Sequence, residues 1–211
     1  MSTKKTVKPF GMKDKLGYMF GDFGNDFTFI LSSMMLMKFY SDVMGVSVGL
    51  VGIMMMAARF VDAFTDVAMG QIVDRSKPTA KGKFTPWLRR MCGPVALASF
   101  LMYASWFADM SMTFKIFWMF FTYLLWGSIC YTGVNIPYGS MASAISADPG
   151  DRQSLSTFRT MGGMLAGMVI GIGLPIIAYD KVELASGATQ DVINGQKVAI
   201  AALLFSVLAI V

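Results

Sequence analysis

Six long apolar segments, separated by short polar stretches, constrain the fold of this 211-residue chain more than any other feature. They cover about residues 16–40, 46–74, 87–108, 112–143, 153–178 and 197–211. A helix needs about 20 residues to cross the hydrocarbon core of a bilayer, and the first five segments reach that length. We therefore expect an all-α integral membrane protein, with a tail over residues 1–15 and a six-helix transmembrane bundle over residues 16–211. The last apolar run, 198–211, is shorter and no polar loop follows it, so we expect the sequence to stop inside its sixth helix.

The composition argues against several classes of protein. Charged residues make up 15% of the chain, whereas soluble domains carry about 25%. The chain has no histidine, which argues against zinc hydrolases and histidine-based acid–base catalysis. Cys92 and Cys130 lie in apolar runs and indicate neither a disulfide nor a metal site. We therefore expect no enzymatic activity and no cofactor.

Basic residues are distributed asymmetrically along the chain. The tail, the stretch 75–90 and Arg152 together hold twelve Lys and Arg residues, whereas the opposite side holds four, namely Lys38, Lys115, Lys181 and Lys197. Excess positive charge marks the cytoplasmic loops of membrane proteins. We therefore expect a multi-pass protein of the cytoplasmic membrane with its N-terminus in the cytoplasm, and no nucleic-acid partner.

Three charged residues interrupt the second apolar segment. Arg59, Asp62 and Asp66 are spaced i, i+3 and i+7, which places them on one face of a helix. Each such group costs about 2.5–3.5 kcal/mol at the centre of a membrane helix, so they are expected to face a protein interior or a water-filled path. The two carboxylates outnumber the one basic side chain, and the carboxylate left without a partner can hold a cation or a proton. The alternative is an ion pair that only holds helices together.

Further polar groups interrupt the first and fifth segments. Asp22 and Asp26 share a helix face, and Asp26 lies about ten residues into its segment, or ~15 Å at 1.5 Å per residue, close to the bilayer midplane. Asp26 is therefore a candidate site residue, or else a partner for Arg59, while Asp22 could be solvated at the interface. Arg159 could snorkel to the interface or donate paired hydrogen bonds to a polyhydroxylated ligand.

The fourth segment combines Thr132 and Asn135, which share a face, with Pro137. Proline frees a backbone carbonyl within a helix, and membrane proteins tolerate this where a cavity or a neighbour satisfies it. We expect this helix to line a cavity with Thr132 and Asn135 pointing inward. The alternative is a kinked packing helix with locally satisfied polar groups.

Several stretches carry a resemblance to a known family. They are residues 23–27 (FGNDF), 40–47 (YSDVMGVS), 58–66 (ARFVDAFTD), 82–87 (GKFTPW) and 135–138 (NIPY). In this order and at these distances the chain resembles the glycoside–pentoside–hexuronide:cation symporters, the melibiose permease-like branch of the major facilitator superfamily. The resemblance covers about residues 16–180 and implies the N-terminal six-helix bundle, half of a twelve-helix transporter.

The resemblance also implies roles for individual residues. Asp62 and Asp66 correspond to the carboxylates of the cation site, and would be the metal ligands if the ion is Na⁺; Thr132 completes that site. Asp26 and Arg159 correspond to sugar-binding residues. Arg59, Asp22 and Thr65 are expected to support the two sites.

The chain departs from a typical member at three positions. Asn135 stands where a second sugar-binding carboxylate is found, Gly139 where a tryptophan stacks on the sugar, and Thr65 where an asparagine lies beside the cation site. Asn135 can still donate and accept hydrogen bonds, so we keep it as a substrate-binding residue. The identity of the sugar and the choice between Na⁺ and H⁺ stay open.

These observations predict a secondary active transporter. We expect cation-coupled symport of a sugar or glycoside across the cytoplasmic membrane by alternating access, in which this half rocks against a missing C-terminal half. The expected partners are the sugar, the coupling cation Na⁺ or H⁺, and the lipid bilayer. The alternative is a facilitator-type carrier for another solute, such as a hexuronate, an amphiphile or a drug-like cation.

Overall fold

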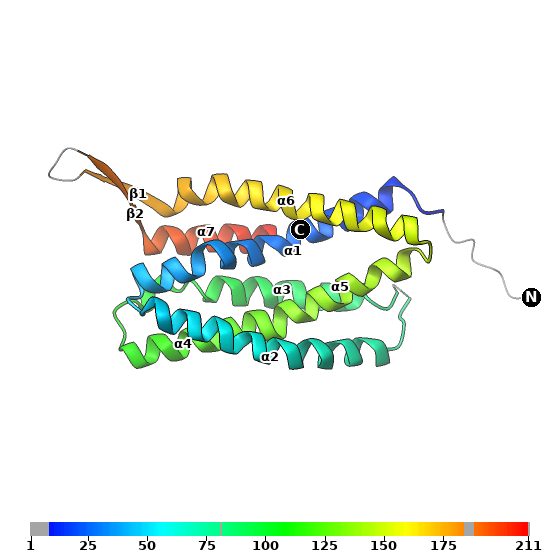
Figure 1. Cartoon of the computed structure of the whole chain (residues 1–211), viewed down its shortest axis with the longest axis horizontal. Coiled ribbons are helices and arrows are strands. Elements are labelled where there is room, and N and C mark those ends of the chain that lie inside the picture. The colour runs from blue at the N-terminus through cyan, green and yellow to red at the C-terminus, as the bar shows by residue number, and fades with distance from the viewer. Residues whose placement is uncertain (1–8, 81, 184–187, 211) are drawn as a thin grey trace, which may run out of the picture.

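The computed structural model describes residues 9–80, 82–183 and 188–210. In these ranges six helical rods lie side by side along the long axis of the molecule (Figure 1). The α-helices are α1 (Met12–Lys38), α2 (Val48–Arg75), α3 (Thr85–Leu101), α4 (Met112–Leu124), α5 (Thr132–Ile145), α6 (Pro149–Ala178) and α7 (Gly195–Leu208). The shorter elements are the π-helical segments η1 (Phe39–Val43) and η3 (Leu125–Tyr131), the 3-10 turn η2 (Ser105–Phe107), and the strands β1 (Tyr179–Glu183) and β2 (Thr189–Ile193). The tail residues Lys4, Lys5 and Lys8 and also Lys81 lie outside the described residues.

Two groups of helices form the bundle. α1 packs most extensively against α6, and both contact α7. In the second group α2 lies against η3 and α5, while α3 contacts α5 and also reaches α7 of the first group. Figure 1 draws the first group above the second. Large apolar side chains from both groups share one core, among them Phe27, Leu31, Met54, Tyr103 and Met119.

Among the described residues, three helices are long and apolar enough to cross a membrane. They are α2, the continuous helix Met112–Ile145 that contains α4, η3 and α5, and α6. α1 has a similar length but carries Asp22 and Asp26 within its apolar stretch. The expected helical membrane bundle is therefore confirmed.

The ends of two helices differ from the sequence expectation. α1 begins at Met12 rather than near residue 16, and the carboxylate of Asp14 accepts a hydrogen bond from the Gly11 N–H at 2.9 Å. α3 ends at Leu101 although the apolar run continues to residue 108. The first residues after Leu101 are apolar because they fill the core: Met102, Tyr103 and Ala104 are fully buried, and the Tyr103 hydroxyl donates to the Leu31 carbonyl at 3.2 Å.

A β-hairpin between α6 and α7 was not expected. β1 and β2 pair antiparallel from Tyr179↔Ile193 to Glu183↔Thr189. At the base of the hairpin, Asp180 forms an ion pair with Lys197 and accepts a hydrogen bond from Asn194 at 2.7 Å. Asn194 also caps α7, because its side-chain oxygen accepts from the backbone N–H groups of Gln196 and Lys197. The hairpin is thus tied to the start of the last helix.

Candidate functional site

A cavity of about 370 Å³ opens between helices of both groups. It contains nearly all of the charged residues that interrupt the apolar segments. Its lining consists of Asp22, Asp26, Phe29, Ser32, Ser33, Met55, Arg59, Asp62, Asp66, Tyr123, Trp126, Gly127, Tyr131, Thr132, Asn135 and Arg159. Of the site residues predicted from the sequence, Thr65 alone is not part of this lining.

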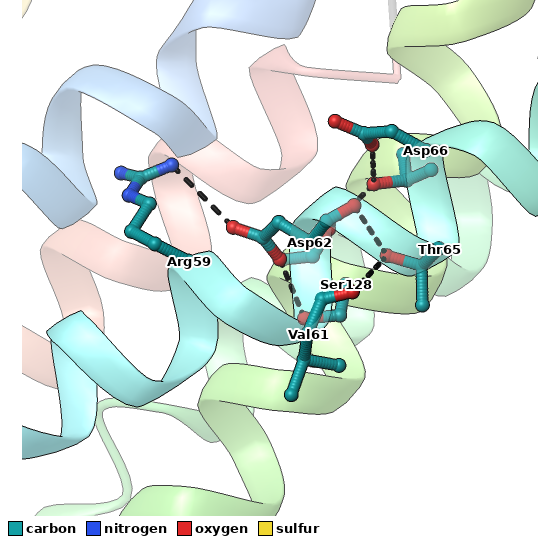
Figure 2. A network of polar contacts seen from close by, with 8 residues as sticks. Arg59, Val61, Asp62, Thr65, Asp66 and Ser128 are labelled. Carbon is teal, nitrogen blue, oxygen red and sulfur yellow. Dashed lines mark hydrogen bonds and ion pairs between the residues drawn. The ribbon is translucent and has the colours of Figure 1, made fainter.

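One end of the cavity holds the two carboxylates of α2. The Ser128 hydroxyl donates to Asp62 Oδ1 at 2.6 Å, and the Thr132 hydroxyl donates to Asp66 Oδ1 at 2.8 Å. Arg59 Nη1 lies 3.4 Å from Asp62 Oδ2, so Asp62 lies between a guanidinium and a hydroxyl (Figure 2). The Arg59 side chain is 64% exposed, and a solvent-exposed ion pair contributes about 0–1 kcal/mol. Arg59 therefore supports Asp62 but does not neutralise the combined charge of the Asp62 and Asp66 carboxylates.

The π-helical segment η3 places these hydroxyls. A π-helix bonds residues five apart instead of four, and such segments often occur at functional sites. The Thr132 side chain follows the same five-residue spacing, because its hydroxyl also donates a hydrogen bond to the backbone carbonyl of Gly127 at 3.2 Å. A Gly-Ser pair at positions 127–128 supplies the weak helix propensity that allows the change. The expectation of one continuous helix is confirmed, and the π segment within it was missed.

The opposite end of the cavity is organised by Arg159 of α6. Its Nε lies 2.9 Å from Asp22 Oδ1, and its Nη2 donates to Asn135 Oδ1 at 3.2 Å. The guanidinium also lies over the Tyr138 ring, 5.2 Å from its centroid. Asp22 is buried, so the reading of it as a solvated interface residue is wrong. The snorkelling reading of Arg159 is wrong as well, since its side chain turns inward to this partner.

Asp26 lies one helical turn beyond Asp22 and lines the same cavity. Within the described residues no side chain donates a hydrogen bond to its carboxylate, so its oxygens remain available as acceptors. A glycine on α6 makes room for it: a Cβ built on Gly163 would stand 2.5 Å from Asp26 Oδ2. Asp26 is therefore not the partner of Arg59, which pairs with Asp62.

Aromatic side chains form a wall that sequence reasoning missed. Tyr131 stacks on Phe29 with ring centroids 5.5 Å apart and lies 5.4 Å from the ring of Trp126. All three line the cavity, together with Tyr123. At the position of the absent tryptophan, a Cβ on Gly139 would approach Arg159 Nη1 at 4.0 Å. The cavity thus has aromatic surface, but from α1, α4 and η3 and not from position 139.

Thr65 does not take the place predicted for it beside the cation site. Its hydroxyl donates to the backbone carbonyls of Val61 and Asp62, both at 3.2 Å (Figure 2). This back-bonding to the preceding turn is common for threonine in helices. The hydroxyl next to Asp62 comes instead from Ser128.

The cavity combines four carboxylates with two guanidinium groups, so two negative charges remain over. Among the residues that the structure describes, no three His, Cys, Asp or Glu side chains come together as a metal site. Two carboxylates with two hydroxyls offer only hard oxygen ligands, which suit a hard cation such as Na⁺, or a proton on one carboxylate. At the other end, paired donors and acceptors can bind hydroxyl groups of a ligand.

An apolar helical bundle around such a charged cavity is typical of membrane transporters. A family model described as MFS/sugar transport protein matches residues 17–211. The chain belongs to this sugar-transport family of the major facilitator superfamily, which confirms the resemblance.

Three curated proteins illustrate its relatives. The chain is 35% identical to an uncharacterized symporter, YjmB, of Bacillus subtilis over 81% of this chain and 37% of that protein. It is 38% identical to a glucuronide carrier protein homolog of Escherichia coli over 71% of this chain and 32% of that protein. It is 35% identical to the isoprimeverose transporter of Lactiplantibacillus pentosus over 79% of this chain and 34% of that protein. The chain thus spans about a third of the length of these relatives.

Proposed function

We propose that the protein carries a sugar or glycoside together with Na⁺ or H⁺ across the cytoplasmic membrane. The observation that supports this most directly is that one cavity has two chemically different ends. Asp62 and Asp66 at one end offer carboxylates for a cation, while Asp26, Asn135 and Arg159 at the other offer acceptors and donors for hydroxyl groups. The relatives include an uncharacterized symporter and an isoprimeverose transporter.

Charge explains how the two ends would be coupled. Without a bound cation the cavity carries two unpaired negative charges within a membrane-spanning bundle, which is unfavourable. A cation at Asp62 and Asp66 would reduce this charge and draw α2 towards η3 and α5, because its ligands come from both. Asn135 lies on α5 three residues after Thr132, so the same movement would position it for the sugar. Such coupling is reciprocal: sugar binding would strengthen cation binding by the same factor.

We infer that the N-terminus faces the cytoplasm. The start of α1, the end of α2 and the turn between α5 and α6 lie at one end of the molecule, and the hairpin lies at the other (Figure 1). The basic residues Lys13, Lys15, Arg75, Arg89 and Arg152 gather at that first end. We further infer that alternating access consists of rocking between this bundle and a second helical bundle of the transporter.

A carrier for another solute is the second candidate. One relative is named a glucuronide carrier homolog, and a hexuronate would need a cation for its carboxylate. Arg159 is the cation at the sugar end, but Asp22 already engages it at 2.9 Å. The free acceptor Asp26 lies beside it, which favours a neutral polyhydroxylated solute.

The test is uptake of radiolabelled glycosides by membrane vesicles under an imposed Na⁺ or H⁺ gradient. We expect accumulation that disappears when the gradient is collapsed and in Asp66→Ala. Asp109→Ala, which removes an exposed carboxylate outside the cavity, is the matched control and should accumulate sugar normally. Uptake that is indifferent to Asp66→Ala or to the loss of both gradients would show the proposal to be wrong.

A further inference from the structure

Ser128 occupies a place at the cation end that the sequence did not predict. It belongs to η3, is 3% exposed, and donates its hydroxyl proton to Asp62 Oδ1 at 2.6 Å. Figure 2 shows Asp62 held between Ser128 and Arg59. The threonine expected in this role, Thr65, directs its hydroxyl to its own helix. The only hydroxyl hydrogen-bonded to the Asp62 carboxylate within the described residues is therefore that of Ser128.

Ser128 and Thr132 match the two carboxylates in register. Asp62 and Asp66 lie four residues apart on α2, and the two hydroxyl residues lie four apart across the junction of η3 and α5. Each hydroxyl meets one carboxylate, at 2.6 and 2.8 Å. The result is two carboxylate–hydroxyl pairs on successive helical turns, contributed by two different helices.

A hydroxyl that donates its proton still has two lone pairs. Ser128 can therefore keep its hydrogen bond to Asp62 and at the same time offer its oxygen to a cation. Hard cations bind in proteins through several oxygen ligands, so each added oxygen strengthens their binding. A proton differs, because it needs one carboxylate oxygen and no neighbouring lone pair. The presence of Ser128 thus favours a metal cation over a proton.

We propose that Ser128 is a ligand of the coupling cation and makes this site bind Na⁺ in preference to H⁺. The inference rests on the proposed cation-coupled transport and adds the identity of one ligand and of the ion. Four oxygens then surround the ion: one from each of Asp62, Asp66, Ser128 and Thr132. Because two come from α2 and two from η3 and α5, the ion joins the two helices.

The experiment measures sugar uptake by vesicles at increasing Na⁺ concentration, and separately under a proton gradient without Na⁺. For Ser128→Ala we expect the Na⁺ concentration at half-maximal uptake to rise by about tenfold, since a hydrogen bond to a charged group is lost with the ligand. Uptake driven by protons should lose much less than uptake driven by Na⁺, because a proton on a carboxylate needs no oxygen ligand from Ser128. Ser128→Thr retains the oxygen and should restore Na⁺ dependence, whereas Ser128→Cys, with a sulfur that binds Na⁺ poorly, should behave like Ser128→Ala.

Ser41→Ala provides the matched control. The Ser41 hydroxyl donates to Asp42 Oδ1 at the same 2.6 Å, but in η1, outside the cavity. This variant loses an equivalent bond and should keep the wild-type response to Na⁺. Thermal unfolding of each variant reports whether it is folded. If Ser128→Ala is not folded, the difference in Na⁺ dependence between Ser128→Thr and Ser128→Cys tests the role of the Ser128 oxygen.

Three results would overturn the inference. The first is a Na⁺ response of Ser128→Ala, or of Ser128→Cys, equal to that of the wild type. The second is an equal loss of Na⁺-driven and proton-driven uptake. The third is a wild type driven by protons alone, which would leave the proposed symport intact. A wild type that accumulates sugar under neither gradient would instead overturn the proposed function itself.

Discussion

Asp22 and Arg159, 137 positions apart in the sequence, meet inside the bundle at 2.9 Å. The Asp22 side chain is 6% exposed and that of Arg159 is 36% exposed, so the pair lies at the wall of the cavity with one partner reaching solvent. α1 and α6, which carry them, form the most extensive helix contact of the described chain. The ion pair thus fixes the sugar end of the cavity to the best-packed pair of helices.

Removal of the charge of Asp22 should affect both stability and sugar binding. Loss of one partner of a buried ion pair costs about 3–5 kcal/mol, but the exposure of Arg159 reduces this, and we expect about 1–2 kcal/mol for Asp22→Asn. The Arg159 guanidinium, once freed from Asp22, should move from its place in the cavity. Sugar affinity should then fall about tenfold or more. Thermal unfolding and the half-saturating sugar concentration measure the two effects. Asp42→Asn, which changes an exposed carboxylate of η1, should change neither. An Asp22→Asn protein with wild-type affinity would contradict the role of the pair.

Gly163 should be essential because of the space that it leaves for Asp26. A Cβ there would stand 2.5 Å from Asp26 Oδ2, so Gly163→Ala must displace the carboxylate. Gly171 lies two turns further along the same helix, and a Cβ there meets nothing within 4 Å. Gly171→Ala should therefore raise helix stability by up to about 1 kcal/mol without harm to uptake. We expect Gly163→Ala to reduce sugar affinity while Na⁺ or H⁺ binding persists, and equal effects of the two substitutions would refute this.

Thr132 and Thr65 provide a comparison between two hydroxyls near the cation end. Thr132→Ala removes a donor to Asp66 at 2.8 Å and should weaken cation dependence about tenfold. Thr65→Ala removes only hydrogen bonds to its own helix backbone and should leave cation dependence within about twofold of the wild type. The measurement is uptake as a function of cation concentration. A reversed order of the two variants would mean that the side chains rearrange when the ion binds.

Asp180 should hold the hairpin at neutral pH and release it in acid. The Lys197 ammonium and the Asn194 amide lower the pKa of Asp180 below its ordinary value of 3.8. A lowered pKa in the folded state means that the contribution is present above that ordinary value and is lost as the pH falls through the lowered one. The ratio of pepsin cleavage of the wild-type hairpin to that of Asp180→Asn, measured at the same pH, should therefore rise as the pH is lowered below about 4.

A variant tests the same contact at neutral pH. Asp180→Asn removes the ion pair with Lys197, and trypsin should then cut after Lys181 faster than in the wild type. Glu183→Gln changes another carboxylate of the same strand and serves as the control. Equal cleavage of the two variants would show that the contact at the hairpin base does not restrain it.

The sequence was sufficient to locate the cavity because charge inside an apolar helix requires a polar environment. Asp62, Asp66, Asp26 and Arg159 were found on that argument, and all line the same cavity. The depth of Asp22 was misjudged because the helix starts at Met12, before the apolar run begins. With that start, Asp22 lies ten residues into α1, where it can reach Arg159.

Ser128 escaped prediction for a different reason. Serine is tolerated almost anywhere in a membrane helix, so its presence in an apolar run carries little signal. Its orientation could not be obtained from a 3.6-residue period either, because η3 departs from that period. The β-hairpin was not predicted because the segment 179–194 is short and mostly polar. Without the contacts that Asn194 and Lys197 make with Asp180, the sequence of this segment is indistinguishable from that of a loop.

The π-helical segment has a consequence for how such cavities can change during evolution. A π-helical segment bonds residues five apart and so holds one residue more than an α-helix of the same rotation. Deletion of one residue from Leu125–Tyr131 would therefore let the segment close into regular α-helix and leave α5 in nearly the same orientation. A deletion elsewhere between α4 and α5 would instead turn α5 by about 100° and move Thr132 and Asn135 out of the cavity together. The π segment is thus the one stretch of this helix whose length can change while Thr132 and Asn135 keep their places.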